Sequence, residues 1–267
     1  MKRAIASFII TLLSLAPFAG AKTAPPVKAF AIDDLINMRR VGDPQISPDG
    51  RTVAYTVTDT DKPANRRTTQ IYLVPVDGGE PRQLTGEKVS SSAPRWSPDG
   101  RRLAFVSARD GEAQIWTADA DSGEAKKLTN VALGAADPVW SPDGKWIAFT
   151  SEVYPDCASD DCNRKRAEAA AASKVKAKVT ERLLYRHWTA WKEGKRNHVF
   201  VASAETGEAR DLTPGDFDAP PFSLGGMTDY AFSPDSKELA FARNTDKDES
   251  RSTNGDIFIV PVAGGEA

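Results

Sequence analysis

The stretch Pro138-Val-Trp-Ser-Pro-Asp-Gly-Lys-Trp-Ile-Ala-Phe149 decides the fold because the chain contains it more than once. The same pattern stands at Pro44–Tyr55 and at Pro94–Phe105, and a weaker copy stands at Tyr230–Phe241. Its Ser-Pro-Asp-Gly core suits a tight turn, since proline presets φ, aspartate bonds its own backbone and glycine accepts a positive φ. Short apolar runs such as Trp146–Phe149 follow the turn, so each copy predicts two strands joined by a turn.

A second hairpin follows each copy, so one repeat predicts a four-stranded antiparallel unit. The turn residues Ser47, Ser97 and Ser141 are 50 and 44 residues apart. Four strands at a period of about 40–50 residues are typical of a propeller blade, and this regularity argues against a flat antiparallel sandwich. We therefore predict an all-β fold, a β-propeller with four recognisable blades. The downstream hairpins are Ile71–Thr85, Ile115–Thr129, Val199–Thr213 and Ile257–Ala267.

The third blade is predicted to carry an insertion. The turns at Ser141 and Ser233 are nearly two periods apart, yet only one downstream hairpin lies between them. We therefore place an insertion at about residues 153–196. We expect a helix over 164–184, where alanine, valine and leucine recur at every fourth position between lysines and arginines. The expected blades cover about residues 44–86, 94–129, 138–213 and 230–267, after a lead-in segment at 22–43.

Residues 1–21 have the layout of a secretory signal peptide. Lys2 and Arg3 precede the apolar run Ala4–Leu15, and Ala19-Gly20-Ala21 suits cleavage after Ala21. The run is shorter than the ~20 residues of a membrane-spanning helix, and no later run is longer. We therefore expect an exported protein, periplasmic or secreted, with no membrane association after cleavage.

The charge balance gives no reason to expect a nucleic-acid partner. The formal net charge is −2, and it becomes −4 once Lys2 and Arg3 leave with the signal peptide. A mildly acidic chain lacks the basic surface that attracts phosphate backbones.

The two cysteines, Cys157 and Cys162, lie in one acidic loop. In an exported protein, a local disulfide is the leading interpretation. The alternative is a metal site that adds Asp160 and Asp161 to the two thiolates, but the CxxC spacing and a nearby histidine are missing. We expect the disulfide and no metal.

The fourth blade is predicted to be incomplete. Pro75–Thr85 runs through its turn into a last strand, whereas Pro261–Ala267 stops just after the equivalent turn. Propellers hide their strand edges by closing into a ring. We therefore expect this sequence to be the front part of a longer protein, and we expect its unfinished strand edges to favour oligomerisation.

Three segments, Asp34–Gly50, Leu183–Phe200 and the two-cysteine loop, resemble the prolyl oligopeptidase (S9) family of serine peptidases. Asp34–Gly50 is similar to the start of the propeller in exported bacterial members, closest to the dipeptidyl-peptidase 5-like and acylaminoacyl-peptidase-like branch. Leu183–Phe200 and the two-cysteine loop are similar to segments of the same branch. The resemblance implies a propeller that covers an α/β-hydrolase domain, filters peptide substrates by size and helps bind their amino end.

No catalytic residue of this family can be assigned within the sequence. The chain contains no Gly-x-Ser-x-Gly nucleophile motif, and its only histidines are His187 and His198. We expect the catalytic domain to follow the propeller in the parent protein, and we expect no cofactor. The alternative function is a TolB-like periplasmic interaction propeller that binds a protein or peptide, because such propellers share the Ser-Pro-Asp-Gly motifs.

The densest cluster of polar and aromatic residues lies in the insertion, at Arg186, His187, Trp188 and Trp191. Two aromatic faces beside a guanidinium suit a peptide, so these residues are candidates for the substrate entrance. The alternative is that both tryptophans anchor the insertion to its own blade.

Glu181 and Glu152 are candidates for the carboxylate that pairs with the ammonium group of a peptide. Ordinary solvated charges are the alternative for both. His198 begins a predicted strand and is expected to be structural.

Overall fold

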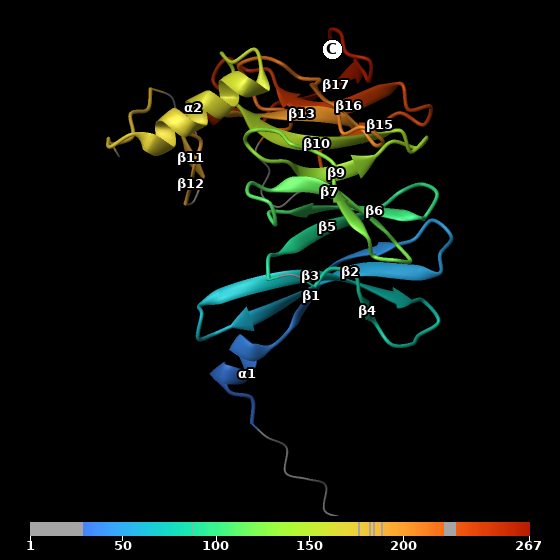
Figure 1. Cartoon of the computed structure of the whole chain (residues 1–267). Coiled ribbons are helices and arrows are strands. Elements are labelled where there is room, and N and C mark those ends of the chain that lie inside the picture. The colour runs from blue at the N-terminus through green and yellow to red at the C-terminus, as the bar shows by residue number, and fades with distance from the viewer. Residues whose placement is uncertain are drawn as a thin grey trace, which may run out of the picture.

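The computed structural model describes residues 29–86, 88–175, 177–181, 183, 185–187, 189–221 and 228–267. The predicted signal peptide at 1–21 lies outside these ranges. Strands dominate the described residues, which confirms the all-β prediction. The sheets follow one another from the blue end of the chain to the red end (Figure 1).

Four antiparallel sheets of the described residues follow one another along the chain, and within each the strands pair in chain order. A separate two-stranded sheet lies in the insertion of the third. Three sheets have four strands, in the orders β1–β2–β3–β4, β5–β6–β7–β8 and β9–β10–β13–β14, and the last described sheet has three, β15–β16–β17. This confirms a propeller with four recognisable blades, the last one incomplete. The strands are β1 (Arg40–Ile46), β2 (Thr52–Asp61), β3 (Arg66–Pro75), β4 (Arg82–Gln83), β5 (Ser91–Trp96), β6 (Arg102–Ser107), β7 (Gln114–Asp119), β8 (Ala125–Lys127), β9 (Ala136–Trp140), β10 (Trp146–Val153), β13 (Arg196–Ser203), β14 (Ala209–Asp211), β15 (Tyr230–Phe232), β16 (Glu238–Asn244) and β17 (Gly255–Pro261).

The first strand begins earlier than the repeated turn motif suggested. A short helix, α1 (Ile32–Asn37), precedes β1, which begins at Arg40, inside the segment 22–43 treated above as a lead-in. The ladder continues across Pro44 through a bulge, at which Asp43 has a φ of 46°. A bulge removes the proline from the hydrogen-bonded ladder, so the strand extends on both sides of it.

Among the described residues, no helix is long and apolar enough to cross a membrane.

Each first hairpin is closed by the same side-chain contact. Ser97 Oγ donates to Asp99 Oδ1 at 2.6 Å, and Asp99 Oδ1 accepts the backbone N–H of Arg101 at 3.1 Å. The same serine oxygen accepts the N–H of Arg102 at 2.9 Å. The serine–aspartate bond recurs at 47–49, 141–143 and 233–235, with distances of 2.5, 2.7 and 2.7 Å. The repeated sequence therefore encodes a repeated turn.

The fourth turn carries serine where the other three carry glycine. Gly144 has a φ of 71°, and Ser236 has a φ of 63°, a conformation that a side chain disfavours. Ser236 Oγ accepts the backbone N–H of Asp143 at 3.0 Å, so its side chain contacts the turn of the third blade. This hydrogen bond between blades offsets the strain of the serine.

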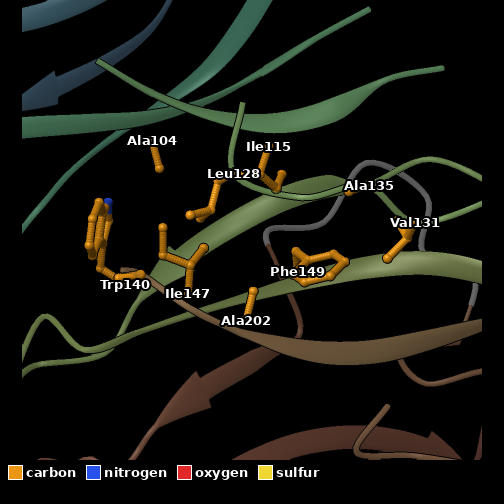
Figure 2. Packing of buried hydrophobic residues seen from close by; sticks show 10 residues of the cluster. Ala104, Ile115, Leu128, Val131, Ala135, Trp140, Ile147, Phe149 and Ala202 are labelled. Atoms are coloured by element: carbon orange, nitrogen blue, oxygen red, sulfur yellow. The ribbon is translucent and has the colours of Figure 1, made fainter. Parts of the chain in front are cut away.

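The hydrophobic core lies between successive sheets. Between the second and third blades, Ile115 and Leu128 face Ile147 and Phe149, and all four are at most 8% exposed (Figure 2). A second cluster joins the third blade to the fourth, and smaller clusters join the first to the second. Burial of one such side chain stabilises the fold by about 1.5–3 kcal/mol, so the contact between blades is a large stabilising term.

Aromatic residues before the turn serines bridge neighbouring blades. The indole N–H of Trp96 donates to Gln45 O of the first blade at 3.0 Å, and that of Trp140 donates to Arg95 O of the second at 3.1 Å. The equivalent residue of the first blade, Ile46, is 63% exposed. In the second and third blades, the residue before the turn serine therefore contacts the preceding blade, whereas Ile46 of the first blade is exposed.

The insertion of the third blade connects β10 to β13. Val153 and Arg196 pair across these strands, so the whole insertion leaves and re-enters the sheet at one place. It contains a helix, α2, and a separate hairpin of two short strands, β11 and β12, and these project from one side of the sheets (Figure 1).

The helix differs from the prediction. We predicted a helix over 164–184, whereas α2 covers Asp160–Ala172. It begins earlier because Ser159 caps it by accepting the N–H of Cys162 at 3.3 Å. It ends earlier because the periodic apolar residues beyond it have no surface to cover: Val175 is 72% exposed and Val179 is 90% exposed.

The expected disulfide between Cys157 and Cys162 is present, with a Cα–Cα distance of 5.4 Å. Both sulfurs are used in this bridge, so the alternative of a thiolate metal site is not realised. The bridged loop brings the start of α2 to the third blade, where the buried Asn163 accepts the N–H of Tyr154 at 2.8 Å.

We predict that Trp140→Phe destabilises the fold by about 1–2 kcal/mol, because it removes one hydrogen bond between blades and some buried volume. Urea unfolding followed by circular dichroism measures the change. Trp191→Phe is the matched control, since Trp191 is 37% exposed and lies outside the blade contacts. Equal stability of the two variants would contradict this role.

A second prediction concerns acid stability. The Ser97 hydroxyl lowers the pKa of Asp99. The stabilisation from a lowered pKa is present above the ordinary value of about 3.9 and is lost as the pH falls through the folded value. We expect Asp99→Asn to destabilise the protein at pH 7, and the difference from wild type to shrink at pH 3. Urea unfolding at both pH values tests this, with the exposed turn residue Asp77→Asn as control. A difference of the same size at both pH values would count against it.

Candidate functional site

An ionic cluster lies where the insertion returns to the third blade. Arg196, the first residue of β13, is mostly buried, with 11% of its side chain exposed. Its Nε donates to Asp216 at 2.9 Å, and its Nη1 donates to Asp218 at 3.1 Å and to Glu249 at 2.6 Å. Burial lowers the pKa of Arg196, but the hydrogen bonds to Glu249 and Asp216 together raise it by a larger amount. The net shift of the pKa is upward, so the residue stays charged.

Asp218 is the most buried acid of the cluster, with 6% of its side chain exposed. It accepts Lys192 and Arg196 on Oδ2 and the backbone N–H of Asn197 on Oδ1 at 2.9 Å. A charge this buried requires cationic partners, because desolvation of an unpaired carboxylate is costly. Asp218 therefore fixes the returning end of the insertion to the loop that follows β14.

The cluster joins two blades and carries an excess of acid. Glu249 belongs to the short 3-10 helix η1 (Glu249–Arg251) of the fourth blade, whereas Arg196 belongs to the third. Three carboxylates surround Arg196 and Lys192, which leaves one negative charge in excess among these five groups.

Glu152 has a cation of its own. Lys195 Nζ donates to Glu152 Oε2 at 2.6 Å. Burial lowers the pKa of Lys195, and the bond to Glu152 raises it more, so the net shift is upward. The charge of this glutamate is therefore compensated within the protein.

A hairpin of the insertion presents an aromatic surface with flanking cations. In β11 (Arg186–His187) and β12 (Ala190–Trp191), Arg186 stands opposite Trp191, and its guanidinium carbon lies 5.4 Å from the indole centroid. Lys178 Nζ lies 5.1 Å from the same indole, and the Tyr185 ring lies 5.7 Å away. Trp191 is 37% exposed and Tyr185 is 40% exposed, so this surface is accessible.

Two hollows adjoin the hairpin. The smaller has a volume of about 450 Å3 and lies between the hairpin and the fourth blade. The larger is an open hollow of about 1450 Å3 between α2, the chain that follows it and β12. The smaller hollow is lined, among others, by Glu152, Arg186, Trp191, Lys192, Asp218 and Glu249.

The structure brings three of the predicted site residues together, since Arg186, Trp191 and Glu152 all line the smaller hollow. Glu181 is exposed and lines the larger hollow. Trp188 lies outside the described residues, and His187 is described only as backbone in β11.

Sequence reasoning missed the cluster around Arg196. Asp216 and Asp218 follow a predicted strand, which is a weak signal for a polar loop. Glu249 lies 53 residues beyond Arg196, and no local pattern connects the two. Only the packing of the fourth blade on the third brings them together.

Comparison with known proteins supports the fold and the predicted resemblance. The family described as the TolB beta propeller domain matches residues 37–227. Dipeptidyl-peptidase 5 of Porphyromonas gingivalis is 32% identical over 276 residues, covering 98% of this chain and 38% of that protein. The uncharacterized peptidase YuxL of Bacillus subtilis is 33% identical, covering 87% of this chain and 34% of that protein. The chain thus spans about a third of the length of these curated relatives.

A solved structure agrees with the fold. Acylaminoacyl peptidase of Pyrococcus horikoshii matches 84% of this chain and 31% of its own, with a TM-score of 0.60 at 17% identity. The chain belongs to the TolB β-propeller domain family. Its resemblance to prolyl oligopeptidase-family enzymes of the dipeptidyl-peptidase 5-like and acylaminoacyl-peptidase-like branch is confirmed.

We predict that Arg196→Met destabilises the protein by about 3 kcal/mol, because it leaves the buried Asp218 with too little positive charge. The double variant Arg196→Met with Asp218→Asn is expected to be more stable than the single variant, since the orphaned charge is then gone. Urea unfolding compares them. A double variant that is less stable than Arg196→Met would contradict this account.

Proposed function

We propose that this chain is the propeller part of an exported S9-family serine peptidase, in which it gates and helps bind peptide substrates. The α/β-hydrolase catalytic domain of that protein is absent from this chain. The observation that carries the proposal is the surface of the insertion, where Arg186 and Trp191 line a hollow together with the carboxylates of Glu152, Asp218 and Glu249, in a chain whose relatives are peptidases by name.

The chemistry of this surface suits the amino end of a peptide. An ammonium group is attracted by the excess negative charge around Arg196. Asp218 and Glu249 of that cluster also line the hollow, and Glu249 is the more exposed of the two. Glu152 lines the same hollow, but Lys195 compensates its charge, so it is the weaker candidate. Trp191 offers a flat face to an apolar side chain, and Arg186 offers donors to peptide carbonyls. Glu181 lies on the rim of the wider hollow.

Export to the periplasm or the exterior is part of the proposal. The amino-terminal residues 1–21 have the pattern of a cleavable signal peptide, and the disulfide suits an oxidising compartment. We also propose self-association of the isolated chain, because Ile257 and Ile259 on β17 are 79% and 54% exposed.

The test compares this chain with a version that continues along its reading frame to the natural stop codon. Both are assayed with chromogenic dipeptidyl and acylaminoacyl substrates. We expect hydrolysis by the extended protein only. If no extension exists and the chain is a stable monomer that binds a periplasmic protein, the interaction-propeller function replaces this one.

The binding surface is tested in the extended protein. We expect Trp191→Ala to raise KM about tenfold with a smaller effect on kcat, because it removes about 1–2 kcal/mol of contact with bound substrate. Trp191→Phe keeps an aromatic face and is expected to keep most of the affinity. Arg51→Ala, an exposed turn residue of the first blade, is the control. An unchanged KM in Trp191→Ala would remove the hairpin from the proposed site.

A further inference from the structure

One buried position of the repeat changes its chemistry in the third blade. In the first two blades it holds Gln70 and Gln114, which lie directly before a buried isoleucine. Each glutamine Oε1 accepts a threonine hydroxyl at 2.7 Å, from Thr85 and Thr129 respectively. In the third blade the equivalent residue is His198, which is 1% exposed.

His198 has two directed contacts. Its Nδ1 lies 2.7 Å from Asp211 Oδ2, and its Nε2 lies 3.0 Å from Gly215 O. The first two blades carry Gln83 and Lys127 at the position of Asp211. Histidine and aspartate have therefore replaced the residues of the other blades together.

The partners of His198 determine where its protons are. A backbone carbonyl only accepts, and so does an ionised carboxylate. Both oxygens receive a hydrogen bond only if each ring nitrogen donates, as in a doubly protonated imidazolium paired with Asp211. Beside an ionised Asp211, a neutral ring would place one nitrogen lone pair against an oxygen lone pair, at a buried position where water cannot compensate.

The contact with Gly215 fixes a loop that serves the candidate site. Gly215 packs so tightly on Phe217 that a Cβ would come within 2.2 Å of the Phe217 ring. That ring also lies 6.0 Å from the His198 ring, and the Arg243 guanidinium covers it at 3.5 Å. Asp216 and Asp218, on either side of Phe217, are the acids that hold Arg196.

We propose that His198 is a positioning residue whose doubly protonated ring, held by Asp211, fixes loop 214–218 and so places Asp216 and Asp218 on Arg196. The relevance of this loop to substrate rests on the proposed function, whereas the protonation and the ordering of the loop do not. Among the described residues, the charged groups that contact the ring or the adjoining Phe217 ring are Asp211 on β14 and Arg243 on β16. Asp216 and Asp218 flank Phe217 in the loop.

The protonation state is tested by nitrogen NMR on the chain labelled with ¹⁵N-histidine. The sequence contains two histidines, so His187→Gln leaves the signals of His198 alone. At pH 7 we expect both ring nitrogens to be protonated. In Asp211→Asn the carboxylate is gone, and we expect one ring nitrogen to lose its proton while the fold persists. A ring with one unprotonated nitrogen in the presence of Asp211 overturns the proposal.

The positioning role is tested by amide hydrogen exchange. His198→Gln introduces the glutamine of the first two blades. A neutral glutamine cannot bind both Asp211 and Gly215 O as a doubly protonated histidine ring does. We expect exchange at Asn197 and Ala219, whose N–H groups bond Asp218 and Asn197 O, to become about tenfold faster. The amides of Ile71 and Ile115 report on the other blades and are expected to be unchanged. Unchanged exchange at Asn197 and Ala219 overturns the role, and Asp211→Asn provides the same readout if His198→Gln does not fold. Neither measurement depends on peptidase activity, so each tests the role of His198 independently of the proposed function.

Discussion

Burial of the apolar face of one sheet against the next is the interaction on which the structure depends. A single four-stranded sheet has no interior, so its apolar residues are removed from water only when a neighbouring blade covers them. Phe105, Phe149 and Phe241 occupy the same place in the second strands of three blades, and each is at most 2% exposed. The sequence repeats because this interface repeats.

The candidate site follows from the same constraint. The insertion projects from the sheets, and its described apolar residues beyond α2 are exposed, so hydrophobic burial of these residues does not hold it in place. Ion pairs, a disulfide and a capped helix do so instead, and they concentrate where the insertion joins the third and fourth blades. Three of the charged groups that fix the insertion, Lys192, Asp218 and Glu249, also line the adjoining hollow.

In the third and fourth blades, some residues differ from the repeat and make additional hydrogen bonds. In the first two blades a buried glutamine pairs with a threonine, whereas the third blade has His198 in place of the glutamine and pairs it with Asp211, at the position of Gln83 and Lys127. In the fourth blade, Ser236 replaces a turn glycine and bonds the preceding blade. Each exchange is accompanied by a new hydrogen bond, which explains why the fold accommodates it.

The sequence by itself determined the strands, the turns, the number of recognisable blades, the disulfide and the place of the insertion. Turn chemistry and strand alternation act over a few residues, so they can be read locally. It did not determine the length of α2, because a helical spacing of apolar residues needs a surface to cover, and Val179 has none. Nor did it reveal the contact of Glu249 with Arg196 or the two acceptors of His198. Those contacts join residues that only the packing of blades and loops brings within reach, and that packing is decided by the tertiary structure.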